Sequence, residues 1–295
     1  MYLILVISLA SFTCFSVQYF VFLTIELVLN KRVKDLKQNA HTNFTAYGFS
    51  ILFIIFAFIF IHLFIKDLNT LEDNSPTSFF IFTMLMNFSF IIIPFFIMPI
   101  VFRLKKLKQW DPINFNFSND QISKIIKGRK LYLIELEDPN AFVMGILSFS
   151  QIIVITQNLF SILDNTEIES IIAHEEGHIK NKHLTKILIS TIALFTFSAI
   201  IQTVFIFPLQ QTSSYYGYII SSYHGISAGI ITFLVGSLNK IYEKEADIFA
   251  GSVTDKIAII SALKKIDSFY DGALNKWSYN YPTLNQRIEN VENNH

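Results

Sequence analysis

Two histidines and a glutamate in the run His-Glu-Glu-Gly-His at 174–178 could together bind a metal ion and move a proton. On a helix that turns about 100° per residue, His174 and His178 lie about 40° apart, which lets two imidazoles share one ion. Glu175 falls about 60° from His178, near enough to hold a water molecule on that ion and accept its proton. The pattern therefore predicts a metal-dependent hydrolase with His174 and His178 as ligands and Glu175 as the base.

The same motif can arise by chance on a charged helix, so the alternative is a solvated helix that carries two histidines. Helical rotation places Glu176 and His183 on the side opposite the ligands. We expect these two side chains to meet solvent or the sheet and to take no part in the site.

A catalytic zinc ion usually has three protein ligands and an open position for water, so the chain must supply one more ligand. The segment Lys240–Gly251 carries Glu243 and Asp247 at i, i+4 spacing, which puts two carboxylates on one helical face. We expect Glu243 to complete a site for one Zn²⁺ per chain and Asp247 to accept a hydrogen bond from a ligand histidine. Glu245 is expected to face elsewhere. The alternative is an exposed acidic helix balanced by neighbouring lysines.

The chain resembles the M48 family of HtpX- and Ste24-like membrane zinc metalloproteases in four blocks, which occur in the family's order between about 110 and 290. The blocks are Asn140–Gly145, Glu167–His183, Glu-x-x-Ala-Asp at 243–247, and Tyr281–Ile288. The resemblance implies a mainly α, multi-pass membrane protein with a small α+β catalytic domain of the gluzincin type. It also implies that an extended substrate adds to an edge strand at the block that opens with Asn140 and Ala141. The segment with Arg287 is expected to close over the cleft and bind substrate, although Arg287 could equally pair with Glu289 or Glu292 on the surface.

Two positions depart from the family pattern. The family commonly has Leu where Glu176 stands, which is harmless if that side of the helix faces away from the metal. It commonly has His where Tyr281 stands, and that histidine stabilises the transition state. Because a phenol hydroxyl can also donate a hydrogen bond to an oxyanion, we expect Tyr281 to take this catalytic role.

The elements that position these residues belong to a chain of 295 residues that is 52% hydrophobic and 16% charged, with 31 Phe and a mean hydropathy of +0.45. A soluble domain of this length needs no such excess of apolar residues, so the composition indicates a membrane protein. The net charge of zero gives no electrostatic reason to expect a nucleic acid partner. Cys14 is the only cysteine, which excludes a disulfide within one chain.

Five apolar runs are each long enough to cross a bilayer. Clusters of Lys and Arg follow the first and third runs, so the positive-inside rule places those loops in the cytoplasm and the N terminus outside. We therefore expect three transmembrane helices over 1–102, a catalytic domain over 103–185, a transmembrane hairpin over 186–239, and the third-ligand helix with the C-terminal part of the catalytic domain over 240–295. The individual runs are 2–29, 46–65, 79–102, 187–207 and 217–238.

Within the catalytic domain the sequence predicts a short helix, a small antiparallel sheet and the metal helix. The helix is expected over 120–127, ended by Gly128, and the strands over 131–137, 141–149 and 151–156. Thr166 and Glu169 have the spacing of a capping box, so the metal helix is expected to begin near Glu167. One hairpin connects the two halves of the metal site, which should lie near the cytoplasmic membrane surface.

Together with the metal motif and the apolar runs, the resemblance implies a zinc-dependent integral membrane endopeptidase. It also implies that the substrates are membrane-associated proteins or peptides, in quality control or in peptide maturation. The expected setting is a bacterial cell membrane, with the lipid bilayer and a protein or peptide substrate as partners. Charged residues at 167, 169, 180 and 182 flank the motif and argue against a site inside the bilayer. The alternative from another class is a proteolytically silent membrane sensor or immunity protein, which would have no need of Glu175.

Overall fold

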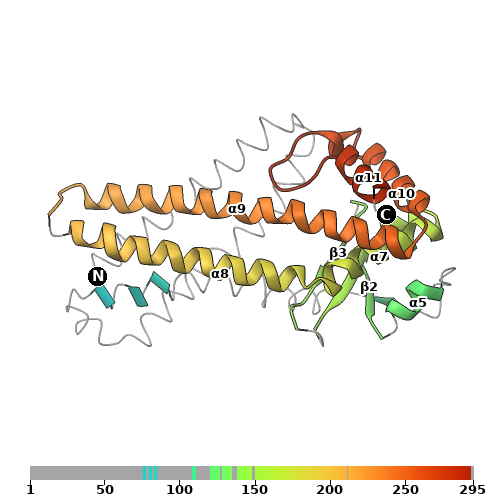
Figure 1. Cartoon of the computed structure of the whole chain (residues 1–295), viewed down its shortest axis with the longest axis horizontal. Helices are drawn as coiled ribbons and strands as arrows, with labels where there is room; N and C mark the ends of the chain where they lie inside the picture. The colour runs from blue at the N-terminus through green and yellow to red at the C-terminus, as the bar shows by residue number, and fades with distance from the viewer. Residues whose placement is uncertain are drawn as a thin grey trace. The chain divides into compact units, whose positions relative to one another are not determined.

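The computed structural model describes residues 76–77, 80–81, 83–84, 108–110, 120–126, 128–134, 138–147, 150–210 and 212–293 (Figure 1). The chain divides into two compact units. The first unit is Met1–Met86 with Phe195–Ile230, and the second is Asn87–Leu194 with Ile231–His295. The predicted spans at 2–29 and 46–65 lie outside the described residues, as does nearly all of the span at 79–102.

Two long apolar helices cover the segment 186–239, where the transmembrane hairpin is predicted. Helix α8, His183–Ile201, continues through a π-helical turn at Gln202–Ile206 and a 3-10 turn at Phe207–Gln210, and α9 runs from Tyr216 to Val253. The 28 residues of His183–Gln210 and the 38 residues of α9 are each long and apolar enough to cross a membrane. At 1.5 Å per residue α9 is about 57 Å long, well beyond the roughly 30 Å of a bilayer's hydrocarbon core, so one helix can contain a span and also carry site residues.

The sheet has four strands among the described residues, in the order β1-β2-β4-β3. Strand β1 pairs antiparallel with β2, and β3 with β4, but the central strands β2 and β4 are parallel. The expectation of an antiparallel sheet is therefore wrong for the central pair. Because β3 reverses the chain and takes the edge beyond β4, β4 returns in the direction of β2. All five residues of β4 are buried, a pattern typical of a strand covered on both faces. The strands are Lys108–Trp110, Lys130–Ile134, Ala141–Met144 and Ile152–Thr156.

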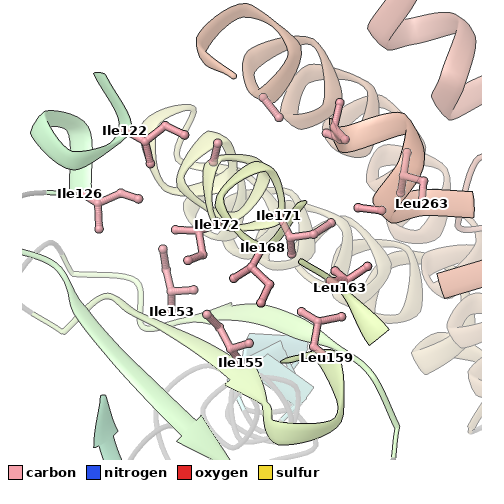
Figure 2. Packing of buried hydrophobic residues seen from close by; sticks show 14 of the residues in the cluster. Ile122, Ile126, Ile153, Ile155, Leu159, Leu163, Ile168, Ile171, Ile172 and Leu263 are labelled. Carbon is pink, nitrogen blue, oxygen red and sulfur yellow. The ribbon is translucent and has the colours of Figure 1, made fainter. Parts of the chain in front are cut away.

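The hydrophobic core of the second unit lies between this sheet and the metal helix. Figure 2 shows Ile153 and Ile155 of β4 against Ile168 and Ile172 of α7, with Leu263 of α10 closing the other side. Each of these side chains is at most 2% exposed, and burial of an isoleucine contributes about 1.5–3 kcal/mol. Among the described residues, this unit contains the start of α8, the end of α9 and five shorter helices: α5 Asp120–Ile126, α6 Gln157–Ile162, α7 Asn165–Lys180, α10 Lys256–Phe269 and α11 Leu284–Glu292.

The N-terminus of α7 is capped by Asp164. Its Oδ1 accepts from the Glu167 N–H at 2.9 Å, and the Glu167 carboxylate accepts from the Asp164 N–H at 2.8 Å. The predicted capping box at Thr166 and Glu169 is wrong, because Asp164 and Glu167 have the same spacing two residues earlier. The Thr166 hydroxyl instead donates to Asp164 Oδ1 at 2.7 Å.

Glu167 also joins α7 to α10, and its removal is expected to destabilise the second unit. The carboxylate is 2% exposed and accepts from Ser261 Oγ at 2.6 Å and Lys265 Nζ at 2.7 Å. Burial raises the pKa of Glu167, but these hydrogen bonds outweigh burial and hold the pKa below its ordinary value of 4.5. Its stabilising effect is therefore complete above about pH 4.5 and is lost as the pH falls through the lower folded-state pKa.

Glu167→Ala should lower the free energy of unfolding by about 2–4 kcal/mol, because it leaves several donors without their acceptor. Thermal unfolding in detergent at pH 7 and pH 4 measures this effect, and the difference from wild type should shrink at the lower pH. The exposed Glu292, changed to Ala, serves as control. An equal shift in melting temperature for both variants would contradict the role of Glu167 in joining α7 to α10.

Candidate metal centre

Helices α7 and α9 bring together the three predicted ligands. The Nε2 atoms of His174 and His178 are 3.2 Å apart, and each lies 3.5 Å from an oxygen of Glu243. One ligand atom from each residue lies within 4.8 Å of the other two. Ligands about 2.0–2.1 Å from a tetrahedral zinc ion are separated by about 3.3–3.4 Å, so the donor set fits Zn²⁺ in type and in spacing. Twelve of the 16 residues of α7 are buried, which rules out the alternative of a solvated helix.

Asp247 lies behind His174, one turn along α9 from Glu243. Its Oδ1 is 3.0 Å from His174 Nδ1, and its side chain is fully buried. Arg287 of α11 donates to the same carboxylate from Nη2 at 2.7 Å and from Nε at 3.0 Å. The predicted contact between Asp247 and a ligand histidine is therefore present. The alternative of a surface Arg287 is wrong, because its guanidinium holds Asp247.

Glu175 is 7% exposed and lies beside the ligands. Burial raises the pKa of Glu175 to about 7, and the charge of Glu243 adds to this effect. Burial and the neighbouring charge of His174 lower the pKa of His178 to about 3, which keeps that imidazole neutral as metal binding requires. Burial also opposes protonation of His174, but its bonds to Asp247 and Glu243 raise its pKa to about 10. A metal ion would therefore displace a proton from His174 on binding.

Tyr281 lies near enough to Glu243 and Glu175 for their charges to act on its phenol. The residue is 50% exposed, yet burial of its hydroxyl and the charges of Glu243 and Glu175 raise the pKa of the phenol to about 12. The hydroxyl therefore stays protonated at neutral pH and can donate a hydrogen bond beside the base.

Glu176 faces the sheet, one of the two surroundings expected for it. It is 3% exposed and accepts from Nη2 of Arg129 at 2.9 Å and from Nε at 3.0 Å; Arg129 immediately precedes β2.

The expectation for His183 is wrong: it is 1% exposed and its Nδ1 lies 2.9 Å from Nδ1 of His178. Glu245 is not one of the three clustered ligand residues; its Oε2 lies 2.9 Å from His183 Nε2. Helix α7 ends at Lys180 and Lys182 has φ 55°, so the rotation of α7 does not position His183.

Strand β3 is the edge of the sheet as described and begins with Ala141. The Asn140 N–H donates to Thr156 Oγ1 at 2.8 Å, and its carbonyl accepts from the Thr156 N–H at 2.9 Å. Backbone groups alternate in direction along an antiparallel strand, so Ala141 and Val143 direct theirs away from β4. Both backbone groups of Asn140 are therefore bonded to Thr156, and only its exposed side chain could bond a substrate. Ala141, in contrast, offers its main-chain groups to an added strand.

A comparison with known families matches residues 121–295 to peptidase family M48. The chain belongs to peptidase family M48. This M48 chain is 26% identical over 178 residues to a protease HtpX homolog of Thermoplasma acidophilum, a match over 56% of the chain and 54% of the relative. It is 39% identical over 64 residues to the homolog of Aquifex aeolicus, over 22% and 20% of the two proteins. The M48 chain thus spans about half or less of the length of these relatives.

The crystal structure of S. mikatae Ste24p has the same fold as this M48 chain. The TM-score is 0.59 at 18% sequence identity, over 96% of this chain and 74% of that protein. The resemblance to the HtpX- and Ste24-like M48 family is therefore confirmed. The prediction of a mostly helical protein with a small sheet is also confirmed. Two of the described helices are candidates for membrane spans.

Gly177 permits the close approach of the two ligand helices. A Cβ atom at this position would lie 3.1 Å from the Ala246 Cα and 3.1 Å from a Phe249 ring carbon. We expect Gly177→Ala to separate α7 from α9 and weaken zinc binding about tenfold, since overpacking costs about 1–3 kcal/mol. Competition with a chelator measures the affinity. Gly225→Ala is the control because, among the described residues, no atom lies within 4 Å of a Cβ there; equal zinc affinity in the two variants would contradict the expectation.

Proposed function

We propose that this protein is a zinc-dependent integral membrane endopeptidase that hydrolyses peptide bonds of membrane-associated proteins or peptides. The observation that carries the proposal is the meeting of His174, His178 and Glu243 at zinc-like spacing, although 65 positions separate the last two in the sequence. The buried Glu175 beside them supports hydrolysis, because a silent sensor or immunity protein would need no base there.

The three ligands would hold the ion, which when bound lowers the pKa of a water molecule and polarises the scissile carbonyl. Glu175 accepts the proton of the attacking water and passes it to the leaving amine. Tyr281 donates its hydroxyl proton in a hydrogen bond to the developing oxyanion. Asp247, itself held by Arg287, orients His174 through the 3.0 Å contact at Nδ1.

The substrate binds in an extended conformation along the outer side of β3, the edge strand of the sheet among the described residues. Ala141 and Val143 supply main-chain donors and acceptors for an added strand, and the exposed side chain of Asn140 can bond the substrate backbone. Recognition through backbone groups suits a protease that accepts many sequences, as quality control of membrane proteins requires. Peptide maturation would need additional side-chain pockets.

The test of this function is zinc content measured together with cleavage of an unfolded protein such as casein, on the full chain purified in detergent. We expect about one zinc per chain, loss of cleavage with a chelator and recovery when zinc is restored. Zinc bound at this ratio without cleavage of any unfolded or membrane-associated substrate would favour the silent sensor instead.

The site faces the cytoplasm at the membrane surface of a multi-pass protein whose N terminus lies outside. Support comes from α8, which begins at His183, five positions after the ligand His178, and from the basic loops after 2–29 and 79–102. A cysteine placed at the exposed Lys264, in a Cys14→Ser background, should escape an impermeant thiol reagent applied to intact cells. If the cysteine at position 264 is labelled in intact cells at the same rate as in lysed cells, the site faces the outside of the cell.

A further inference from the structure

A second histidine lies behind the ligand His178. His183 is 1% exposed, and its Nδ1 lies 2.9 Å from Nδ1 of His178, on the side of that ring away from Glu243. The other nitrogen of His183, Nε2, lies 2.9 Å from the Glu245 carboxylate. A continuous chain of polar contacts thus runs from the ligand cluster through two imidazoles to a carboxylate.

Metal binding by His178 determines which ring nitrogen of His178 and of His183 carries a proton. A ligand Nε2 on His178 needs a free lone pair, so the proton of that ring is on Nδ1 and must be donated to His183. Since His183 Nδ1 then accepts, the proton of His183 is on Nε2, where it is donated to Glu245. Only this tautomer pair satisfies all four nitrogens with neutral rings and an ionised carboxylate.

The surroundings of His183 hold it in this orientation. The ring stacks on Tyr242, with centroids 4.6 Å apart and planes 16° from parallel. Lys186 Nζ lies 3.4 Å from Glu245 and 5.5 Å from the centroid of Tyr242. Lys182, with its left-handed φ of 55°, turns the chain so that His183 folds back onto His178.

We propose that His183 and Glu245 are positioning residues that fix the orientation and tautomer of the ligand His178. The two ligand histidines would then both be supported by carboxylates, His174 directly by Asp247 and His178 through one intervening imidazole. This inference rests on the proposed function in taking the bound ion to be zinc. It gives the His183–Glu245 pair a role in metal affinity, because partners of this kind orient a ligand and raise its basicity.

The test measures the zinc affinity of the full chain in detergent by competition with a chelator, for His183→Leu, His183→Asn and Glu245→Gln. His183→Leu should bind zinc about 10–100-fold more weakly, the usual effect of losing such a partner. His183→Asn should bind zinc more tightly than His183→Leu but less tightly than wild type, because its amide oxygen replaces Nδ1 as acceptor for the His178 proton while the contact with Glu245 is lost. Glu245→Gln should weaken binding less than His183→Leu and add no further loss when combined with it.

Glu292→Gln, which removes an exposed carboxylate from α11, is the control. Wild-type affinity in a folded His183→Leu would overturn the proposal, as would an equal loss in the Leu and Asn variants. If His183→Leu does not fold, His183→Asn and Glu245→Gln decide: a loss in His183→Asn at least as large as that in Glu245→Gln supports the proposal. Wild-type affinity in His183→Asn, or a larger loss in Glu245→Gln, overturns it.

These outcomes are separable from those that bear on the proposed function. A wild-type protein that binds zinc but cleaves nothing overturns the endopeptidase and leaves the effect of His183 on affinity to be read from the variants. Active protease with unchanged zinc affinity in all three variants overturns only the role of His183 and Glu245. A wild-type protein that binds no zinc overturns both.

Discussion

Glu175→Gln is expected to reduce peptide cleavage by about 10²–10⁴-fold, the usual contribution of a general base, while zinc binding stays close to wild type. The amide keeps the shape of the carboxylate but cannot accept the proton of the attacking water. Because Glu175 contributes no atom to the ligand cluster, zinc content should not follow activity. The measurement is kcat/KM for an unfolded substrate, together with zinc content, on the two purified proteins.

The neighbouring Glu176→Gln is the matched control, since it changes a carboxylate on the same helix that faces Arg129 and the sheet. Its activity should stay within about threefold of wild type. Cleavage by Glu175→Gln at the wild-type rate would show that the proton is taken by another group.

The pH dependence of the reaction gives a second measurement on the same residue. With the pKa of Glu175 raised to about 7 by burial, the base is lost as the pH falls through that value. A bound dication would lower this pKa, so we expect an acidic limb of kcat/KM at or below about pH 7. The residual activity of Glu175→Gln should lack this limb.

The local features of the metal site follow from the sequence because they depend on helical rotation alone. His174 and His178 on α7, and Glu243 and Asp247 on α9, each lie one turn apart, and their relation within a helix needs no tertiary information. That the two helices would meet was predicted from the chemistry, which requires a third ligand, rather than from any pattern of packing.

Two features that the sequence does not predict depend on where the chain leaves a helix or strand. Extending the rotation of α7 puts His183 on the wrong side, because the helix ends at Lys180 and the chain turns at Lys182. The parallel pairing of β2 and β4 depends on where β3 docks, and strand-length runs alone do not decide that. The signal available was the wholly apolar run 152–155, which favours a central strand over an edge strand.

Arg287→Met is expected to lower the free energy of unfolding of the second unit by about 3–5 kcal/mol and to weaken zinc binding. The substitution leaves Asp247, fully buried, without the cation that lies 2.7 Å from it. The same buried pair holds the pKa of Arg287 above its ordinary value, so the guanidinium stays charged throughout the working pH range. An unpaired Asp247 would then take up a proton or shift, and in either case the 3.0 Å contact with His174 Nδ1 would be weakened. Arg287→Lys, which keeps the charge but cannot bond both carboxylate oxygens, should fall between wild type and Met.

This variant also distinguishes support of the metal site from direct binding of substrate by Arg287. A residue that only contacts substrate would raise KM while melting temperature and zinc affinity remained unchanged. Loss of a residue that holds Asp247 would lower both the melting temperature and the zinc affinity, because Asp247 contacts the ligand His174. Arg129→Met is the matched control, because it breaks the partly buried pair with Glu176 on the face of α7 away from the ligands. It should lower the melting temperature in a similar way and leave zinc affinity unchanged. A loss of zinc affinity in Arg129→Met equal to that in Arg287→Met would mean that general destabilisation, and not the contact between Asp247 and His174, accounts for the effect.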